Sequence, residues 1–169
     1  MSEAVTPWIH IVAVAVWLGP QLFMFLVAVP ALRLIEDAQL RAKVMRAVVT
    51  RFGWLAWAAM LVIVLSGMSN LFQEADDFDH VWDPDYRYFQ LFSTKMVLVG
   101  LTVALTAIHS FVIGPRQLAL AEEPPADPER AASLRRLSMI VSGLALVLSI
   151  AVVYVAAVLA NHDYSFQPT

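Results

Sequence analysis

Four long apolar blocks alternate with polar segments along the chain. A helix needs about 20 apolar residues to cross the hydrocarbon core of a bilayer. The pattern therefore predicts four membrane-spanning helices, at about residues 7–32, 52–72, 89–114 and 137–160. We expect an all-α, up-down-up-down four-helix bundle that forms a single transmembrane domain over residues 1–169. The halves show a loose two-fold resemblance but no convincing internal repeat.

The composition supports a membrane protein and restricts its chemistry. Hydrophobic residues make up 60% of the chain and charged residues 15%, whereas about a quarter of a soluble domain is charged. The lipid bilayer is the expected partner, and the small net charge of −3 indicates no nucleic acid. Cysteine is absent, which leaves His, Met, Lys and carboxylates as ligands for a metal or cofactor.

Charge is distributed unequally among the connections. Nine of the 11 basic residues fall in segments 33–51 and 115–136, whereas segment 73–88 holds one Glu and five Asp. By the positive-inside rule, the basic connections are cytoplasmic, and the acidic connection and both termini are outside. We expect this arrangement in a bacterial-type inner (plasma) membrane.

The acidic segment 73–88 could bind a cation, but its composition has a simpler explanation. Its aromatic residues are typical of a membrane interface, and its carboxylates are typical of a solvated loop. We therefore prefer a solvated loop, and we expect His80 and His162 to be solvated as well.

Three ionisable residues lie within the predicted spans, where charged groups are costly and often functional: His10, Lys95 and His109. On the third helix, Lys95 shares a stripe with Thr102, Thr106 and His109, at offsets of 7, 11 and 14 residues. The first helix repeats these offsets from His10 to Trp17, Gln21 and Met24. Both stripes are expected to face the bundle interior.

Depth separates these residues into two levels. His10 and Lys95 each lie near the outer end of a helix and can share a site. His109 follows Lys95 by 14 residues, which places it roughly 21 Å deeper, at the level of Met24. His10 and His109 of one subunit therefore cannot hold the same metal ion.

Each residue also has an ordinary explanation. Lys95 can extend its ammonium to the headgroups, His10 can bond a backbone carbonyl or water, and His109 can be an interfacial or helix-terminal histidine. Small residues such as Gly67 and Gly143 suit close helix contact. They are compatible with a homodimer or a larger membrane complex, and the oligomeric state stays open.

The segment from His10 through Trp17 to Gly19 resembles the first helix of the CopD-like (copper-resistance D) family and of the related HemJ-type protoporphyrinogen oxidases. The segment Lys95-Met-Val-Leu-Val is similar to the Lys-initiated helix of the same group, and residues 109–116 are similar to its ending. The resemblance implies a four-helix membrane fold with a b-type haem.

The same resemblance implies roles for individual residues. His10 would be the axial ligand of haem b, and Lys95 its partner or a contact to a propionate or substrate. The chain lacks the run of Arg and Tyr that follows the first helix in those oxidases, and it has Pro20-Gln21 where they do not. Porphyrinogen oxidation is therefore not implied, and a haem-dependent membrane oxidoreductase is only one candidate.

Three functional hypotheses follow. The leading one is a b-type haem protein with a redox or electron-transfer role, with His10 as metal ligand, Lys95 nearby and Trp17 as part of an aromatic wall. His109, with Met24, is a weaker second metal or cofactor site.

The alternatives belong to other classes of protein. A copper-handling or transport protein would use His10 with Met68 or the acidic connection, because His and Met suit copper. A structural accessory subunit of a respiratory or photosynthetic complex would need neither histidine.

Overall fold

The computed structural model describes residues 4–77, 81–122 and 128–169. Helices account for nearly all of these residues, and no strand forms among them. Four stretches in the described ranges are long and apolar enough to cross a membrane. The prediction of an all-α, membrane-spanning fold is confirmed.

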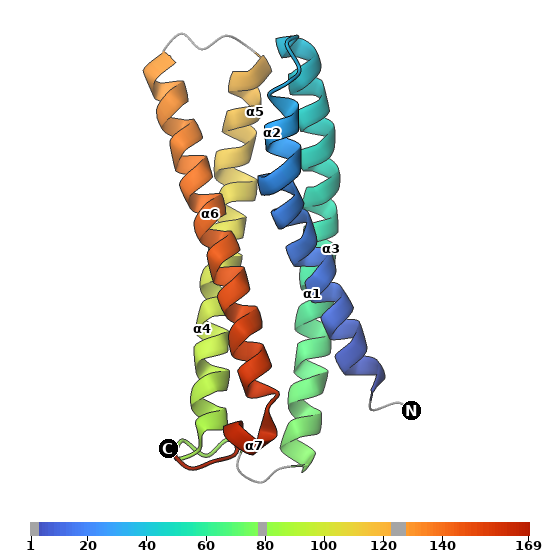
Figure 1. Ribbon diagram of the computed structural model, residues 1–169, viewed down its shortest axis with the longest axis vertical. Coiled ribbons are helices and arrows are strands. Elements are labelled where there is room, and N and C mark those ends of the chain that lie inside the picture. The colour runs from blue at the N-terminus through green and yellow to red at the C-terminus, as the bar shows by residue number, and fades with distance from the viewer. Residues whose placement is uncertain (1–3, 78–80, 123–127) are drawn as a thin grey trace.

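Each predicted span corresponds to one continuous helical rod, and two of the rods contain a π-helix. The elements are α1 (Val5–Phe23), η1 (Met24–Ala28), α2 (Val29–Leu32), α3 (Ala38–Asp77), α4 (Arg87–Ile108), η2 (His109–Ile113), α5 (Gly114–Glu122), α6 (Pro128–Leu159) and the short α7 (His162–Ser165). Figure 1 shows the four rods running side by side in alternating directions.

The helices extend further than the apolar blocks. Helix α3 begins at Ala38 rather than near residue 52, and α6 begins at Pro128 rather than near 137. The Asp37 carboxylate caps α3 by accepting from the backbone N–H of Gln39 (2.8 Å) and Leu40 (3.1 Å). Most residues of the two predicted basic loops are therefore helical. Hydropathy identifies the part of a helix that can lie in lipid, but it does not show where the backbone hydrogen bonding of that helix ends.

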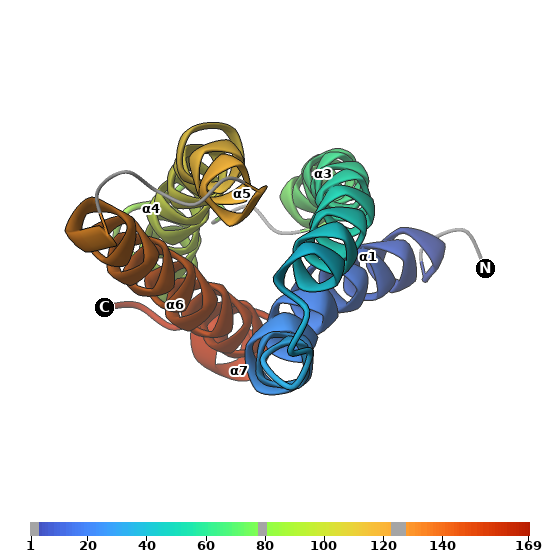
Figure 2. The same cartoon turned by 90° about the horizontal axis from the view of Figure 1, so that it is seen from above.

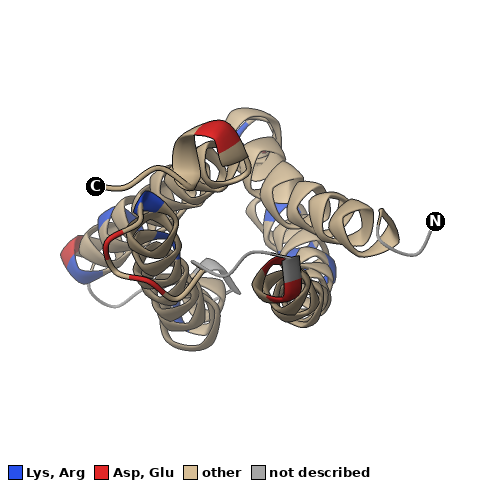
Figure 3. Ribbon diagram, turned by 90° about the horizontal axis from the view of Figure 1, so that it is seen from below, with Lys and Arg blue, Asp and Glu red and all other residues tan. Residues whose placement is uncertain are grey.

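The two ends of the molecule differ in charge. The connection from α2 to α3, the end of α5 and the start of α6 lie at one end, here called the basic end. The start of α1, the end of α3, the start of α4 and the C-terminus lie at the opposite end, here called the terminal end (Figure 1). Viewed towards the terminal end, acidic residues occur on the α3–α4 connection, at the end of α3 and near the C-terminus (Figure 3).

The bundle consists of two helix pairs. Helix α1 packs along α3, and α4 packs along α6, whereas the two pairs meet through the smaller contacts of α1 with α6 and of α3 with α5 (Figure 2). Small residues such as Ala13, Ala59 and Ala145 are buried at these contacts. Large apolar side chains such as Leu26 point outward, as expected where lipid is the solvent.

The two π-helices occupy matching positions in the two halves. Each ends shortly before a proline, Pro30 after η1 and Pro115 after η2. Proline lacks an N–H and clashes with the carbonyl four residues earlier, and one wider turn relieves that conflict. The same offset of 85 residues aligns His10 with Lys95 and Met24 with His109. The halves therefore correspond more closely than hydropathy alone indicated.

Candidate functional site

His10 lies near the start of α1 and turns its imidazole towards α3. Its Nδ1 is 2.9 Å from Ser66 Oγ, and Ser66 donates its hydroxyl proton to the carbonyl of Val62, at 2.6 Å. Because that proton is committed, Ser66 accepts the hydrogen bond from Nδ1–H of His10. When the imidazole is neutral, this tautomer leaves the Nε2 lone pair to bind a metal ion or to accept a proton.

Gly67 gives the imidazole its place on α3. A Cβ added at Gly67 would lie 3.1 Å from Cε1 of His10 and 3.6 Å from its Nδ1. The absence of a side chain therefore lets the ring lie against the helix backbone. We predicted that Gly67 allows close helix contact, and in the structure it gives the His10 ring room beside Ser66.

Lys95 lies on α4, in the other helix pair. Its ammonium is 5.3 Å from the centre of the Phe92 ring, a cation–π distance. Lys95 and the His10 imidazole lie within electrostatic range of each other, and so do Glu74 of α3 and Lys95. The structure thus groups His10 and Lys95 near the terminal end and adds Glu74, which the sequence analysis left in the acidic loop.

Trp17 lies one level deeper and is 6% exposed. It forms a buried cluster with Ala59 and Met60 of α3, and Val103 of α4 packs against this cluster. The indole is therefore part of the core between α1 and α3. Core packing explains the burial of Trp17.

Gln21 links the two helix pairs at mid-depth. Ser149 of α6 shares its one hydroxyl proton between the carbonyl of Ala145, at 2.7 Å, and Gln21 Oε1, at the longer distance of 3.4 Å. Gln21 in turn donates to the carbonyl of Trp17 at 3.3 Å. Gln21, which lies on the predicted stripe of the first helix, therefore has a structural role. Its partner Ser149 was not predicted from the sequence.

His109 begins η2 and is held near the basic end. Its Nε2 is 3.1 Å from Ser138 Oγ of α6, and Ser138 donates to Gln117 Oε1 at 2.9 Å. His109 and Gln117 are eight residues apart, about 80° apart on a regular α-helix. The π-helix takes up one extra residue and brings both side chains to one face. The hydrogen-bond partner of His109 is thus Ser138, and Met24 begins η1, the matching π-helix of the first rod.

His162, which we expected to be solvated, has a side chain that is 43% exposed. Its Nε2 also lies 3.2 Å from Oε1 of Glu74, whose side chain is 29% exposed. His80, also expected to be solvated, lies outside the described residues. In the part of the chain that the structure describes, no group of three or more His, Cys, Asp or Glu side chains is placed to bind a metal.

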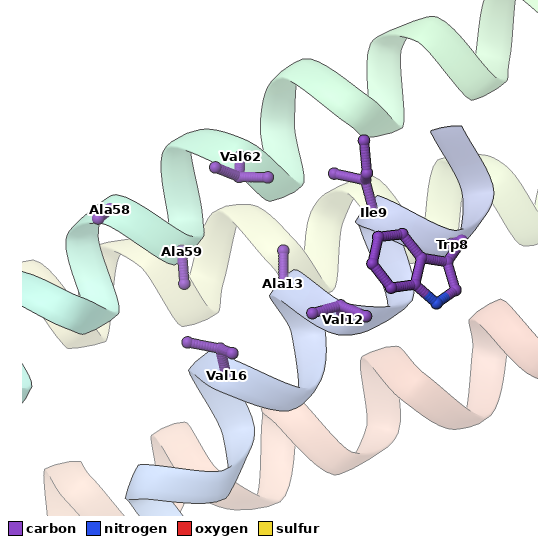
Figure 4. A pocket seen from close by; sticks show the side chains of 8 residues that line it. All are labelled: Trp8, Ile9, Val12, Ala13, Val16, Ala58, Ala59 and Val62. Atoms are coloured by element: carbon purple, nitrogen blue, oxygen red, sulfur yellow. The ribbon is translucent and has the colours of Figure 1, made fainter. Parts of the chain in front are cut away.

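An apolar groove lies between α1 and α3 and has a volume of about 340 Å³. Figure 4 shows the side chains that line it: Trp8, Ile9, Val12, Ala13, Val16, Ala58, Ala59 and Val62. His10 is not among them, and Trp8 is 64% exposed. The groove is therefore part of the hydrocarbon-facing surface, separate from the His10 site.

Comparison with known proteins identifies the family. A family model described as copper resistance protein D (CopD) matches residues 46–159. The match contains Ser66, Lys95 and His109, and begins after the first span, which carries His10. No curated protein and no solved structure matches the chain. Because the match extends over more than half of the chain, the protein belongs to the CopD family, as its resemblance to CopD-like proteins predicted.

Proposed function

We propose that this CopD-family protein is a b-type haem-binding membrane protein with a redox or electron-transfer role, and that His10 is the axial ligand. The observation that carries the proposal is the hydrogen bond from His10 Nδ1 to Ser66 Oγ at 2.9 Å. A hydrogen bond at one imidazole nitrogen fixes the ring and directs the other nitrogen to a metal.

The number of available ligands favours haem over a copper ion at His10. A porphyrin supplies four nitrogens itself, so one imidazole from a helix bundle suffices to hold it. A copper ion bound by the protein alone needs several His, Met or Cys ligands. Met68, the expected thioether helper, is 51% exposed, and the described residues form no larger ligand group.

The surrounding residues suit an anionic, flat group. A protonated Lys95, within electrostatic range of His10, would contact a propionate or act as the partner of His10. Trp17 adds a buried aromatic ring deeper on α1. A bound b-type haem would supply one-electron chemistry at a potential set by its ligands and burial. Neither residue has a role in porphyrinogen oxidation under this proposal.

His109 is a weaker candidate for a second metal or cofactor site. Ser138 fixes one nitrogen of its ring as Ser66 fixes one nitrogen of His10. Met24 would offer a thioether at a comparable depth, since it begins the matching π-helix of the first rod. The two histidines bond different helix pairs near opposite ends of the bundle, so they would serve separate centres.

Copper handling or transport is the second candidate function, because the matching family is named for copper resistance. This function would require copper ligands beyond His10, for example carboxylates near the terminal end. Under both proposals, copper handling and haem binding, the terminal end lies outside a bacterial-type inner membrane. This orientation follows from the positive-inside rule, because basic residues gather at the opposite end.

One purification tests these alternatives. The visible spectrum of the protein from a haem-replete membrane should show a Soret band that is lost in His10→Ala and retained in His109→Ala. A colourless, fully folded protein with stoichiometric copper would reject haem in favour of copper handling. A folded protein with neither group, co-purifying with other subunits, would support an accessory role and reject both.

A further inference from the structure

A second apolar groove lies on α3 towards the basic end, and it contains one charged residue. The groove has a volume of about 390 Å³ and is lined by Ala47, Val48, Arg51, Phe52 and Leu55. We call it the Arg51 groove. Its other four residues lie within about one helical turn of Arg51, so the charged side chain leaves the helix among apolar side chains.

Arg51 is placed to bind an anion at the membrane surface. It is the last charged residue before the apolar block of α3, which puts it at the level of the lipid headgroups at the basic end. It is exposed, and within the part of the chain that the structure describes it makes no hydrogen bond, ion pair or ring contact. A guanidinium binds a phosphate group through two parallel hydrogen bonds. The headgroup phosphate of a lipid therefore suits Arg51.

The face of α3 that carries Arg51 continues into the groove between α1 and α3. Leu55, Ala58 and Val62 follow Arg51 at offsets of 4, 7 and 11 residues, which keeps them within about 40° of its direction on the helix. Ala58 and Val62 line the groove between α1 and α3, and Figure 4 shows them near side chains of α1. The two grooves therefore lie in line along one face of α3.

The length of this face matches one acyl chain. The 11 residues from Arg51 to Val62 extend roughly 16 Å along the helix. One leaflet supplies half of a hydrocarbon core of about 30 Å, or about 15 Å. A chain whose headgroup lies at Arg51 would therefore end near Val62. The small side chain of Ala58 leaves room for the chain between Leu55 and Val62.

We propose that this face of α3 binds one anionic phospholipid from the leaflet at the basic end. The lipid phosphate contacts Arg51, and one acyl chain lies along Leu55, Ala58 and Val62. Charge favours a lipid over a second copy of the chain, because a copy in the same orientation would bring its own basic end to the level of Arg51. The lipid site does not depend on a haem at His10.

Native mass spectrometry tests the headgroup contact. The full-length protein is released from nanodiscs that contain phosphatidylglycerol and phosphatidylcholine in equal amounts. We expect one phosphatidylglycerol to be retained per chain, with a preference of about fivefold over the zwitterionic lipid, and Arg51→Gln should abolish this preference. Arg136→Gln is the matched control, because Arg136 is exposed and also directly precedes an apolar block, but lies on α6, which lines neither groove. It should retain phosphatidylglycerol as the unaltered protein does.

A second pair of variants tests the acyl-chain contact. Ala58→Leu places a larger side chain in the path of the chain and should lower the retention of phosphatidylglycerol about threefold or more. Ala104→Leu makes the same change at an exposed alanine in the apolar part of α4, and it should leave retention unchanged. Equal retention in the two variants would contradict an acyl chain along this face.

The unaltered protein alone can overturn the proposal, so the test does not depend on how the variants fold. Equal retention of the two lipids would show that Arg51 selects no anionic headgroup. Displacement of phosphatidylglycerol by an equal concentration of inorganic phosphate would show a phosphate site without an acyl-chain contact. A dimer that carries no lipid would show that a second copy covers this face of α3. Each of these results rejects the lipid site.

Discussion

Ser66 and Gly67, which carry no ionisable group, determine how the His10 imidazole is placed. Ser66 supplies the acceptor for Nδ1, and Gly67 supplies the space in which the ring lies. The sequence marked His10 as a candidate because an ionisable group within a span is costly. It gave no indication of Ser66, which lies 56 residues away and looks like any small residue at a helix contact.

Gly67→Ala should disturb the His10 site. Alanine favours a helix over glycine by about 1 kcal/mol, but its Cβ would lie 3.1 Å from His10 Cε1, and overpacking of this kind costs about 1–3 kcal/mol. We therefore expect a protein of equal or lower thermal stability, with a shifted or weakened Soret band if haem is bound.

Gly100→Ala is the matched control, because nothing lies within 4 Å of a Cβ at that position of α4. It should gain stability without any spectral change. A Gly67→Ala protein that gains as much stability as Gly100→Ala, with an unchanged spectrum, would contradict the packing of His10 on Gly67.

At the scale of elements, the sequence predicted the four spans but not their ends or their internal register. The extra turns of α3 and α6 lie beyond the apolar blocks, where Asp37 and Pro128 start the helices. The π-helices arise from Pro30 and Pro115, and they change which side chains share a face. A 100° periodicity therefore put Lys95 of α4 and His109, the first residue of η2, on one predicted stripe. It could not associate His109 with Gln117 across η2.

Pro115→Ala should uncouple His109 from Gln117. Alanine restores the N–H and removes the clash with the carbonyl of Phe111, so η2 can become α-helical. The segment after it would then rotate by about one residue, roughly 100°, and Gln117 would leave Ser138. Because the chain has no cysteine, a cysteine pair at positions 117 and 138 can report this geometry through its disulfide yield.

The disulfide yield should be high in the protein that keeps Pro115 and low in the Pro115→Ala variant. Pro20→Ala is the control, because Pro20 lies within α1 in the other half of the chain, far from the cysteine pair in sequence. An equal yield with and without Pro115→Ala would show that η2 does not depend on its proline.

At the scale of the whole molecule, the polar residues lie at the contacts within and between two helix pairs. The large apolar side chains face outward, where lipid is the solvent. His10 and His109 each bond the partner helix of their own pair, Ser66 on α3 and Ser138 on α6. Lys95 and Glu74 interact electrostatically from different pairs. The predicted stripes located the residues on α1 and α4, but the contributions of α3, α6 and α7 depend on packing between segments far apart in the sequence.

The charge difference between the ends predicts a fixed orientation that single cysteines can measure. Asp163 lies on α7 at the terminal end, and Arg135 lies on α6 towards the basic end. Basic segments are retained in the cytoplasm, so an impermeant maleimide should label Asp163→Cys in intact cells and Arg135→Cys only after lysis. Ile140→Cys, at a position 66% exposed on the apolar part of α6, should label poorly in both. Labelling of Arg135→Cys in intact cells would reverse the orientation.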